Sequence, residues 1–275
     1  MSEKLEYLSE MIANSLEKNK DILKKKFNES KNEVGVRYCF LDNLLAETVA
    51  MEIFNLFPEQ KQMRKMSSFR EKKYTSKNFD LFSPILSDIT FAIQEPNVIS
   101  KVEEITGIKN QIADSSLYAG GLSLMEKGNF LNPHIDNSHE QSRKFYRTLN
   151  LLYYVTPDWQ LENGGNLELW DLKVEKNVTI VSRFNRLVIM ETNPWSWHSV
   201  SPIVVNQKRL CVSNYYFSPD SPIGKSYFNV TSFNARPNQK IRRVYSFLDS
   251  KVRNMIRYVV PKGIGKVDVY KGKIN

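Results

Sequence analysis

Two histidines and one aspartate have the types and the order of a metal site. His134 and Asp136 are separated only by Ile135, and His198 follows in a later segment that is rich in aromatic residues. In an extended strand, residues i and i+2 point to the same side, so His134 and Asp136 can reach one ion while Ile135 turns into the core. We expect His198 to come from a partner strand. Two histidines and a carboxylate on one face of an octahedral iron(II) leave positions open for a co-substrate and dioxygen.

A candidate carboxylate-binding residue, Arg209, follows His198. Polar and apolar residues alternate after it, which predicts a strand with one polar face. That face carries Arg209, Cys211, Ser213 and Tyr215. A planar guanidinium binds a carboxylate through a bidentate ion pair, so Arg209 suits the far carboxylate of a dicarboxylate co-substrate. Ser213 could add a hydroxyl donor. The alternative is an arginine at a strand edge, exposed to water.

Six short motifs occur in a fixed order between about Tyr118 and Phe217. They are His134-Ile-Asp136, Leu152-Tyr-Tyr-Val155, Asp158-Trp159, Gly164-Gly-Asn-Leu167, His198-Ser-Val-Ser-Pro202 and Arg209. This ordered set resembles the prolyl 4-hydroxylase-like branch of the iron(II)/2-oxoglutarate dioxygenases. The resemblance covers roughly the middle third of the chain.

The resemblance implies a set of cofactors and site residues. Iron(II) would be held by His134, Asp136 and His198, which are also the catalytic residues. The co-substrate 2-oxoglutarate would be bound by Arg209 and Tyr154, with dioxygen as oxidant and ascorbate as reductant. The implied substrate contacts are Arg147, Tyr215 and Tyr118.

The implied reaction is hydroxylation of an unactivated C–H bond, with release of succinate and carbon dioxide. Because halogenating relatives carry a small residue in place of the carboxylate, Asp136 favours hydroxylation. The pattern is similar to that of prolyl hydroxylases acting on ribosomal proteins, so a prolyl residue of a protein or peptide is the first substrate expected. A free metabolite or a surface saccharide is an alternative. A catalytically idle jelly-roll binding protein is the alternative from another class, and substrate-free turnover of 2-oxoglutarate distinguishes it.

Strand and turn patterns predict a mostly β core, a double-stranded β-helix (jelly roll), within an α+β chain. Strands are expected at 147–155, 166–172, 178–181, 187–190, 197–203 and 210–217, with a turn at Asn163-Gly-Gly165. We expect a mainly helical region at 1–110, the catalytic core at 111–220 and a basic extension at 221–275, all in one structural domain.

Helices dominate the predicted N-terminal region. After an initial helix, residues 34–40 read as a strand, and Asp42 is a candidate N-cap for a helix that Pro58 ends. Ser83-Pro84 marks the start of a helix to Gln94, and another runs over 97–106. The polar, basic segment 61–78 shows no period and is expected to be a loop, either lying over the site or without a role.

The excess positive charge lies at the C-terminal end. From Arg236 to Asn275 there are eleven Lys or Arg against two Asp, a net of +9, which equals the charge of the whole chain. Apolar residues at i, i+3 and i+4 predict an amphipathic helix from Gln239 to Val259. In one interpretation, its apolar stripe packs on the core or across a homodimer. Alternatively, its charges recruit an anionic partner, either nucleic acid or an acidic membrane.

The composition is that of a chain with a substantial core, at 41% hydrophobic residues. No apolar run reaches the ~18 residues needed to span a bilayer, and the charged N-terminus lacks an apolar leader, so we expect a cytoplasmic protein. Cys39 and Cys211 have no metal-type spacing, which suits a reducing compartment. Of the side chains near the motifs, we expect His139 to face solvent and Trp197 to be in the core, while Trp195 fits either place.

Overall fold

The computed structural model describes residues 2–118, 120–240, 243 and 270. The predicted basic helix from Gln239 to Val259 lies almost wholly outside these residues. The helices and 3-10 turns are α1 Glu3–Lys18, α2 Lys20–Glu29, α3 Lys31–Val34, α4 Glu47–Asn55, η1 Gln60–Gln62, η2 Phe79–Leu81, α5 Pro84–Ala92, α6 Pro96–Thr106 and η3 Leu161–Asn163. The strands are β1 Tyr38–Leu41, β2 Arg64–Ser67, β3 Glu71–Ser76, β4 Ile112–Ala113, β5 Gly121–Met125, β6 Phe130–Ile135, β7 Tyr146–Tyr154, β8 Leu167–Trp170, β9 Asn177–Ile180, β10 Arg186–Glu191, β11 His198–Val200, β12 Arg209–Ser218 and β13 Ser232–Phe233.

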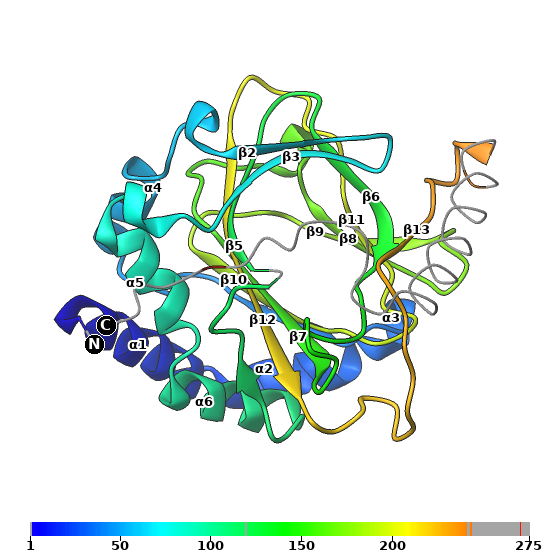
Figure 1. The fold of residues 1–275 in the computed structure, drawn as a ribbon, viewed down its shortest axis with the longest axis horizontal. Coiled ribbons are helices and arrows are strands. Elements are labelled where there is room, and N and C mark those ends of the chain that lie inside the picture. The colour runs from blue at the N-terminus through cyan, green and yellow to red at the C-terminus, as the bar shows by residue number, and fades with distance from the viewer. Residues whose placement is uncertain (1, 119, 241–242, 244–269, 271–275) are drawn as a thin grey trace.

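The strands form one antiparallel sheet that curls into a half-barrel (Figure 1). One half has the order β1-β10-β7-β12-β5, and the other has the order β6-β11-β8-β9. Strand β3 joins the halves, because it pairs with β5 on one side and β6 on the other. The predicted jelly-roll core with helical N-terminal additions is confirmed. The division of the chain into three regions, with boundaries at residues 110 and 220, stays a prediction.

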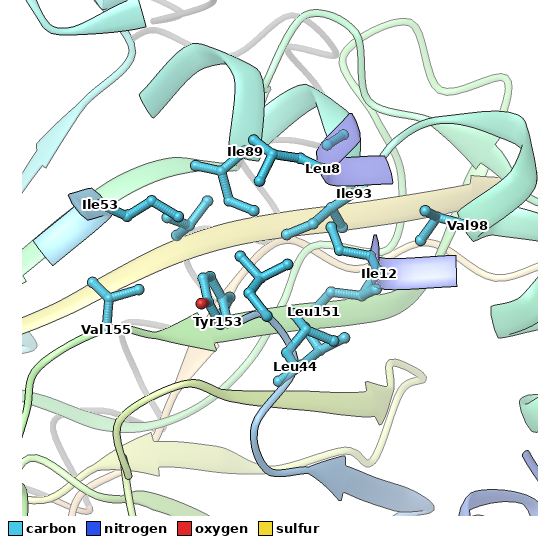
Figure 2. Packing of buried hydrophobic residues seen from close by; sticks show 14 of the residues in the cluster. Leu8, Ile12, Leu44, Ile53, Ile89, Ile93, Val98, Leu151, Tyr153 and Val155 are labelled. Carbon is cyan, nitrogen blue, oxygen red and sulfur yellow. The ribbon is translucent and has the colours of Figure 1, made fainter. Parts of the chain in front are cut away.

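Helices α1, α2, α5 and α6 pack on the outer face of the larger half-sheet (Figure 1). Helix α1 begins at Ser2, whose hydroxyl accepts a hydrogen bond from the Leu5 amide at 3.0 Å. Leu8 and Ile12 of α1 lie one turn apart and are fully buried, and they pack toward Leu151 of β7 (Figure 2).

Alternation along β7 and β12 separates this core from the interior of the barrel. Leu151 and Tyr153 face the helices, whereas Asn150 and Leu152 line the inner cavity. In β12, Val212 packs in the helical core, and the four residues predicted to share the polar face all line the cavity. These four are Arg209, Cys211, Ser213 and Tyr215. The predicted strand and its inward face are confirmed.

The prediction of a loop at 61–78 is wrong, because this segment contains the β2–β3 hairpin. Backbone pairing of β3 with both β5 and β6 supplies the hydrogen bonds that a surface loop would lack. Neither face of this hairpin is fully buried, so its sequence carries no strong alternation of polar and apolar residues. In Figure 1 the cyan hairpin crosses the top of the half-barrel.

Two predictions near β1 also differ from the structure. The strand begins at Tyr38 and not at residue 34, because Gly35 has a left-handed φ of 82° and ends α3. Helix α4 starts at Glu47 with Ala46 as its N-cap, so Asp42 does not cap it. Asp42 instead accepts hydrogen bonds from Arg186, at 2.5 and 2.8 Å. The predicted helices after Ser83 and Pro96 are confirmed as α5 and α6.

None of the described helices is both long enough and apolar enough to cross a bilayer. Cys39 and Cys211 are both buried free thiols.

Candidate metal centre

Three ligand-type side chains from separate parts of the chain meet inside the barrel. His134 lies in β6 and His198 begins β11, and the two residues are directly opposite in the antiparallel pairing. Asp136 follows β6 by one residue. Its Oδ1 lies 3.6 Å from His134 Nε2, and its Oδ2 lies 3.6 Å from His198 Nε2. One ligand atom from each residue falls within 4.8 Å of the others, and in the described part of the chain no other group of three or more such residues is found.

Backbone carbonyls fix the orientation of both imidazole rings. His134 Nδ1 lies 3.0 Å from the carbonyl oxygen of Asn132, and His198 Nδ1 lies 3.0 Å from that of Ser196. A carbonyl can only accept, so each Nδ1 carries the proton and each Nε2 presents a lone pair toward Asp136. Such a carbonyl contact is the usual support for a histidine that binds a metal.

Charge and burial keep these groups in the protonation states that a cation needs. Burial, assisted by the nearby His198, lowers the pKa of His134 to about 3, so its ring is neutral. Burial alone would raise the pKa of Asp136, but the positive charge of Arg147 lowers it on balance to about 2. Arg147 Nη1 lies 3.3 Å from Asp136 Oδ1.

A further observation supports a divalent cation in this site. Asp136 Oδ2 is buried and makes no hydrogen bond to the described residues, which is costly for a carboxylate oxygen. A metal ion between this oxygen and the two Nε2 atoms would satisfy it. Two neutral imidazoles and one carboxylate on one side of a cavity form the donor set typical of non-heme iron(II).

A segment that follows β12 covers one side of the donor group. Strand β13 pairs with β6 and places Phe233 opposite His134. The two rings stack with centroids 5.3 Å apart. The Asn229 side chain donates to the backbone oxygen of Asp136 at 2.8 Å, which fastens the same segment next to the carboxylate. We call residues 229–236 the strap.

The donor group opens into a cavity of about 340 Å³. Arg209 lies in its wall and is 3% exposed. Its Nε donates to the Ser182 hydroxyl at 3.2 Å, and its guanidinium lies 4.7 Å from the centre of the Tyr154 ring. The Tyr154 hydroxyl is buried and makes no hydrogen bond of normal geometry. A buried cation and an unsatisfied hydroxyl next to each other fit a carboxylate ligand.

The other residues predicted for the site fall into two groups. Ser213, Arg147 and Tyr215 line the cavity, and the Arg147 guanidinium lies over the Tyr215 ring at 4.2 Å. Tyr118 is not among the described residues that line the cavity, and its backbone oxygen accepts a hydrogen bond from Lys77. Tyr154 is not among the described residues that line the cavity, and its ring lies against the guanidinium of Arg209, which does line it.

Three side chains near the motifs can also be placed. His139 is buried rather than solvent-facing, with its Nδ1 2.7 Å from the Ser138 hydroxyl, and it lies outside the donor group. Trp197 is only partly buried and not in the core as predicted, because β11 begins after it and Trp197 lies in the preceding turn. Trp195 is exposed.

Sequence reasoning missed the cavity residues that come from the hairpin and the strap. They are Arg70, Glu71, Lys73, Thr75, Thr231 and Phe233. No motif marks them, since the hairpin and the strap reach the site through strand pairing with β5 and β6 rather than through neighbours in sequence. The basic composition of 61–78 was the one available signal.

Residues 120–217 match the family model described as 2OG-Fe(II) oxygenase superfamily. The chain is 30% identical over 88 residues to prolyl 3-hydroxylase OGFOD1 of mouse (Mus musculus), covering 30% of this chain and 16% of that protein. It is 32% identical over 76 residues to the protein of the same name from Xenopus laevis, covering 26% and 15%. The chain thus spans only a small part of the length of these relatives.

Two solved structures share the fold. A prolyl hydroxylase from Trichoplax adhaerens, in complex with a hypoxia inducible factor oxygen degradation domain peptide fragment, has a TM-score of 0.52 at 20% identity. That match covers 74% of this chain and 92% of the other. A prolyl 4-hydroxylase from Phytophthora capsici has a TM-score of 0.52 at 16% identity, covering 92% and 79%. The donor group and the shared fold agree with the match of residues 120–217 to the 2OG-Fe(II) oxygenase superfamily.

Proposed function

We propose that this chain is a hydroxylase dependent on iron(II) and 2-oxoglutarate, and that it acts on a prolyl residue of a peptide or protein. The observation that carries the proposal is the placement of the donor group and of Arg209 in the walls of one cavity. The expectation of iron(II) and 2-oxoglutarate from the sequence agrees with the family model that residues 120–217 match and with the donor group.

The residues have separate roles in this proposal. His134, His198 and Asp136 hold the metal, since their ligand atoms converge and their rings are fixed by backbone carbonyls. Arg209 binds the far carboxylate of 2-oxoglutarate, and the Tyr154 hydroxyl donates to the same carboxylate. When bound, iron(II), 2-oxoglutarate and dioxygen supply the oxidising chemistry that hydroxylates a C–H bond and releases succinate and carbon dioxide.

Ser213 and the substrate contacts belong to the same wall of the barrel. Ser213 lies on the Arg209 face of β12 and lines the cavity, which supports its proposed role as a donor to the co-substrate. Arg147 pairs with Asp136 and lies over the Tyr215 ring, which supports the proposal that both residues contact the substrate beside the metal. The curated relatives and the two fold neighbours are named as prolyl hydroxylases, which supports a prolyl residue as the target.

The test begins with turnover in the absence of substrate. Purified protein with iron(II), ascorbate and 2-oxoglutarate should release succinate above a metal-free control. A library of proline-containing peptides should then include members that gain the mass of one oxygen on proline. Absence of succinate under all conditions would favour the idle binding protein. Succinate with an oxygen gain only on a metabolite or saccharide would overturn the prolyl assignment alone.

A further inference from the structure

Two polar side chains of β7 line the cavity with unused hydrogen-bonding atoms. Arg147 and Asn150 are each 2% exposed. Arg147 Nε and Nη2 and Asn150 Oδ1 are buried and make no hydrogen bond to the described residues. A buried polar atom without a partner destabilises a fold, so such atoms in the wall of a cavity indicate a ligand that pairs with them.

An irregularity in β7 places both side chains on the same face of the strand. Regular alternation would turn Arg147 and Asn150 to opposite faces, because the two residues are separated by an odd number of positions. Thr148, however, is an extra residue in the pairing of β7 with β12, between Arg147 and Leu149. A bulge of this kind redirects a side chain, and bulges are common next to active sites. Arg147 thereby joins Asn150 in the cavity wall.

Tyr215 of β12 holds both side chains in place. Its hydroxyl accepts a hydrogen bond from Asn150 Nδ2 at 3.3 Å, and the centre of its ring lies 4.2 Å from the guanidinium carbon of Arg147. Arg147 Nη1 lies 3.3 Å from Oδ1 of Asp136, which belongs to the donor group. These contacts use one part of each side chain and leave Asn150 Oδ1, Arg147 Nε and Arg147 Nη2 for a ligand. The unused atoms of Arg147 therefore lie next to the metal centre, where the substrate must bind.

The unused atoms are of opposite types. Guanidinium N–H groups only donate, and the Asn150 side-chain oxygen only accepts. A ligand that satisfies both must offer an acceptor and a donor close together. A carboxylate would satisfy Arg147 alone and leave Asn150 Oδ1 without a partner. An extended peptide satisfies both, because its carbonyl and N–H groups alternate along each edge of the chain.

We propose that Arg147 and Asn150 form a subsite for the main chain of a peptide substrate, in which Arg147 donates to a carbonyl beside the oxidised residue and Asn150 accepts from a main-chain N–H. The proposal rests on the proposed prolyl hydroxylase function and adds to it how the substrate is recognised. Because the nitrogen of a prolyl residue within a chain carries no hydrogen, the N–H must come from a neighbouring residue. A second proline at that neighbouring position would remove the donor, so Asn150 is a specificity-determining residue.

Peptides that lack single main-chain N–H groups test the subsite directly. Each labelled peptide of a series carries an ester oxygen in place of one N–H near its central proline. Fluorescence anisotropy measures their affinities with iron(II) and 2-oxoglutarate but without dioxygen, so that no turnover occurs. At one position the ester should weaken binding roughly tenfold relative to the parent amide, because it leaves the buried oxygen of Asn150 without a donor.

Asn150→Leu provides the decisive comparison. This variant has no side-chain acceptor, so the ester peptide should bind to it at least as well as the parent amide does. Loss of folding cannot produce that result, because it would abolish the binding of both peptides. Asn150→Ala makes the same test with a smaller side chain if leucine prevents folding. The matched control is Thr75→Val, which removes a polar group that lines the cavity from β3 and should retain the full difference between amide and ester.

Three outcomes would overturn the proposal. One is equal binding of amide and ester peptides to the wild type at every position. The second is a difference that persists in the Asn150 variants, which would assign the N–H to another acceptor. Neither result affects the proposed function, which succinate release and the gain of oxygen on proline report separately. The third is failure of every proline peptide to bind while succinate is released without substrate, which would overturn the prolyl assignment and the subsite together.

Discussion

The ring of Phe233 stacks on the imidazole of His134, with 19° between the ring planes. Phe233 lies in the strap, far from His134 in sequence, and β13 brings the two residues into register on β6. An aromatic ring on one side of a metal ligand limits access of water from that side and holds the imidazole in place. The strap therefore contributes to the site although it lies outside residues 120–217, which match the family model.

An ion pair at the end of the strap should stabilise the fold. Arg236 donates to both carboxylate oxygens of Glu168, at 3.0 and 2.6 Å, and the Ser199 hydroxyl, next to His198, donates to the same carboxylate. Arg236→Met leaves Glu168 uncompensated and mostly buried, which should cost on the order of 3 kcal/mol. We expect the melting temperature to fall by roughly 6 °C or more. The exposed pair Lys208–Glu59 supplies the control, and Lys208→Met should change stability little. Equal effects of the two variants would contradict the role of the buried pair.

Removal of either histidine ligand should abolish iron binding and turnover together. His134→Ala and His198→Ala each delete a donor whose Nε2 faces Asp136, but the helical core on the outer face of the sheet does not depend on the ion. Iron content and succinate release should both be lost, while the far-ultraviolet circular dichroism spectrum is retained. His139→Ala is the control, since His139 lies outside the donor group, and it should keep its iron. Turnover by either ligand variant would show that the donor group is misassigned.

Loss of Arg209 should weaken the use of 2-oxoglutarate. Removing one member of a buried charged pair costs on the order of 2–5 kcal/mol, so Arg209→Ala should raise the half-saturating concentration about tenfold or more. Tyr154→Phe should change it less in the same direction, because a neutral donor contributes less than a guanidinium. Arg183→Ala provides the control, since that side chain is 60% exposed. An unaltered requirement in Arg209→Ala would assign the carboxylate to another residue.

The sequence predicted the donor group because its geometry is largely local. His134 lies in β6 and Asp136 directly follows this strand, two residues further on, and alternation along β12 directs Arg209 inward. His198 was placed by its chemical type, and its pairing with His134 follows once the strands are assigned.

The features that the sequence could not predict depend on contacts between residues that are far apart in the chain. Asp42 had the local features of an N-cap, yet it pairs with Arg186, more than a hundred residues away. Segment 64–76 has no alternation of polar and apolar residues that would predict a strand. Strand β3 is stabilised by hydrogen bonds to β5 and β6 rather than by a buried face. Phe233 likewise reaches His134 only through β13.

Gly164 should tolerate no side chain, although another left-handed glycine should. A Cβ on Gly164, at φ +70°, would lie 1.9 Å from the backbone oxygen of Pro202 in the chain that follows β11. A Cβ on Gly128, at φ +80°, would meet nothing within 4 Å. Both alanine variants carry the backbone cost of about 1–2 kcal/mol, and overpacking should add about 1–3 kcal/mol for Gly164→Ala alone. Urea unfolding of both variants measures the difference. Equal losses of stability would show that the turn at Gly164 can move away from Pro202.

The ion pair between Asp42 and Arg186 should make part of the stability sensitive to acid. Burial alone would raise the pKa of Asp42, but hydrogen bonds and charge from Arg186, with a smaller effect of Arg183, lower it below 3.8. A carboxyl whose folded pKa is lowered stabilises the protein above its unfolded pKa, and this contribution is lost as the pH falls through the folded pKa. Asp42→Asn should therefore be less stable than the wild type at pH 7, and the difference should shrink below about pH 4. Urea unfolding across this range measures it, with the exposed Asp80→Asn as control. A difference that stays constant with pH would mean that Asp42 contributes through shape or neutral hydrogen bonds and not through its charge.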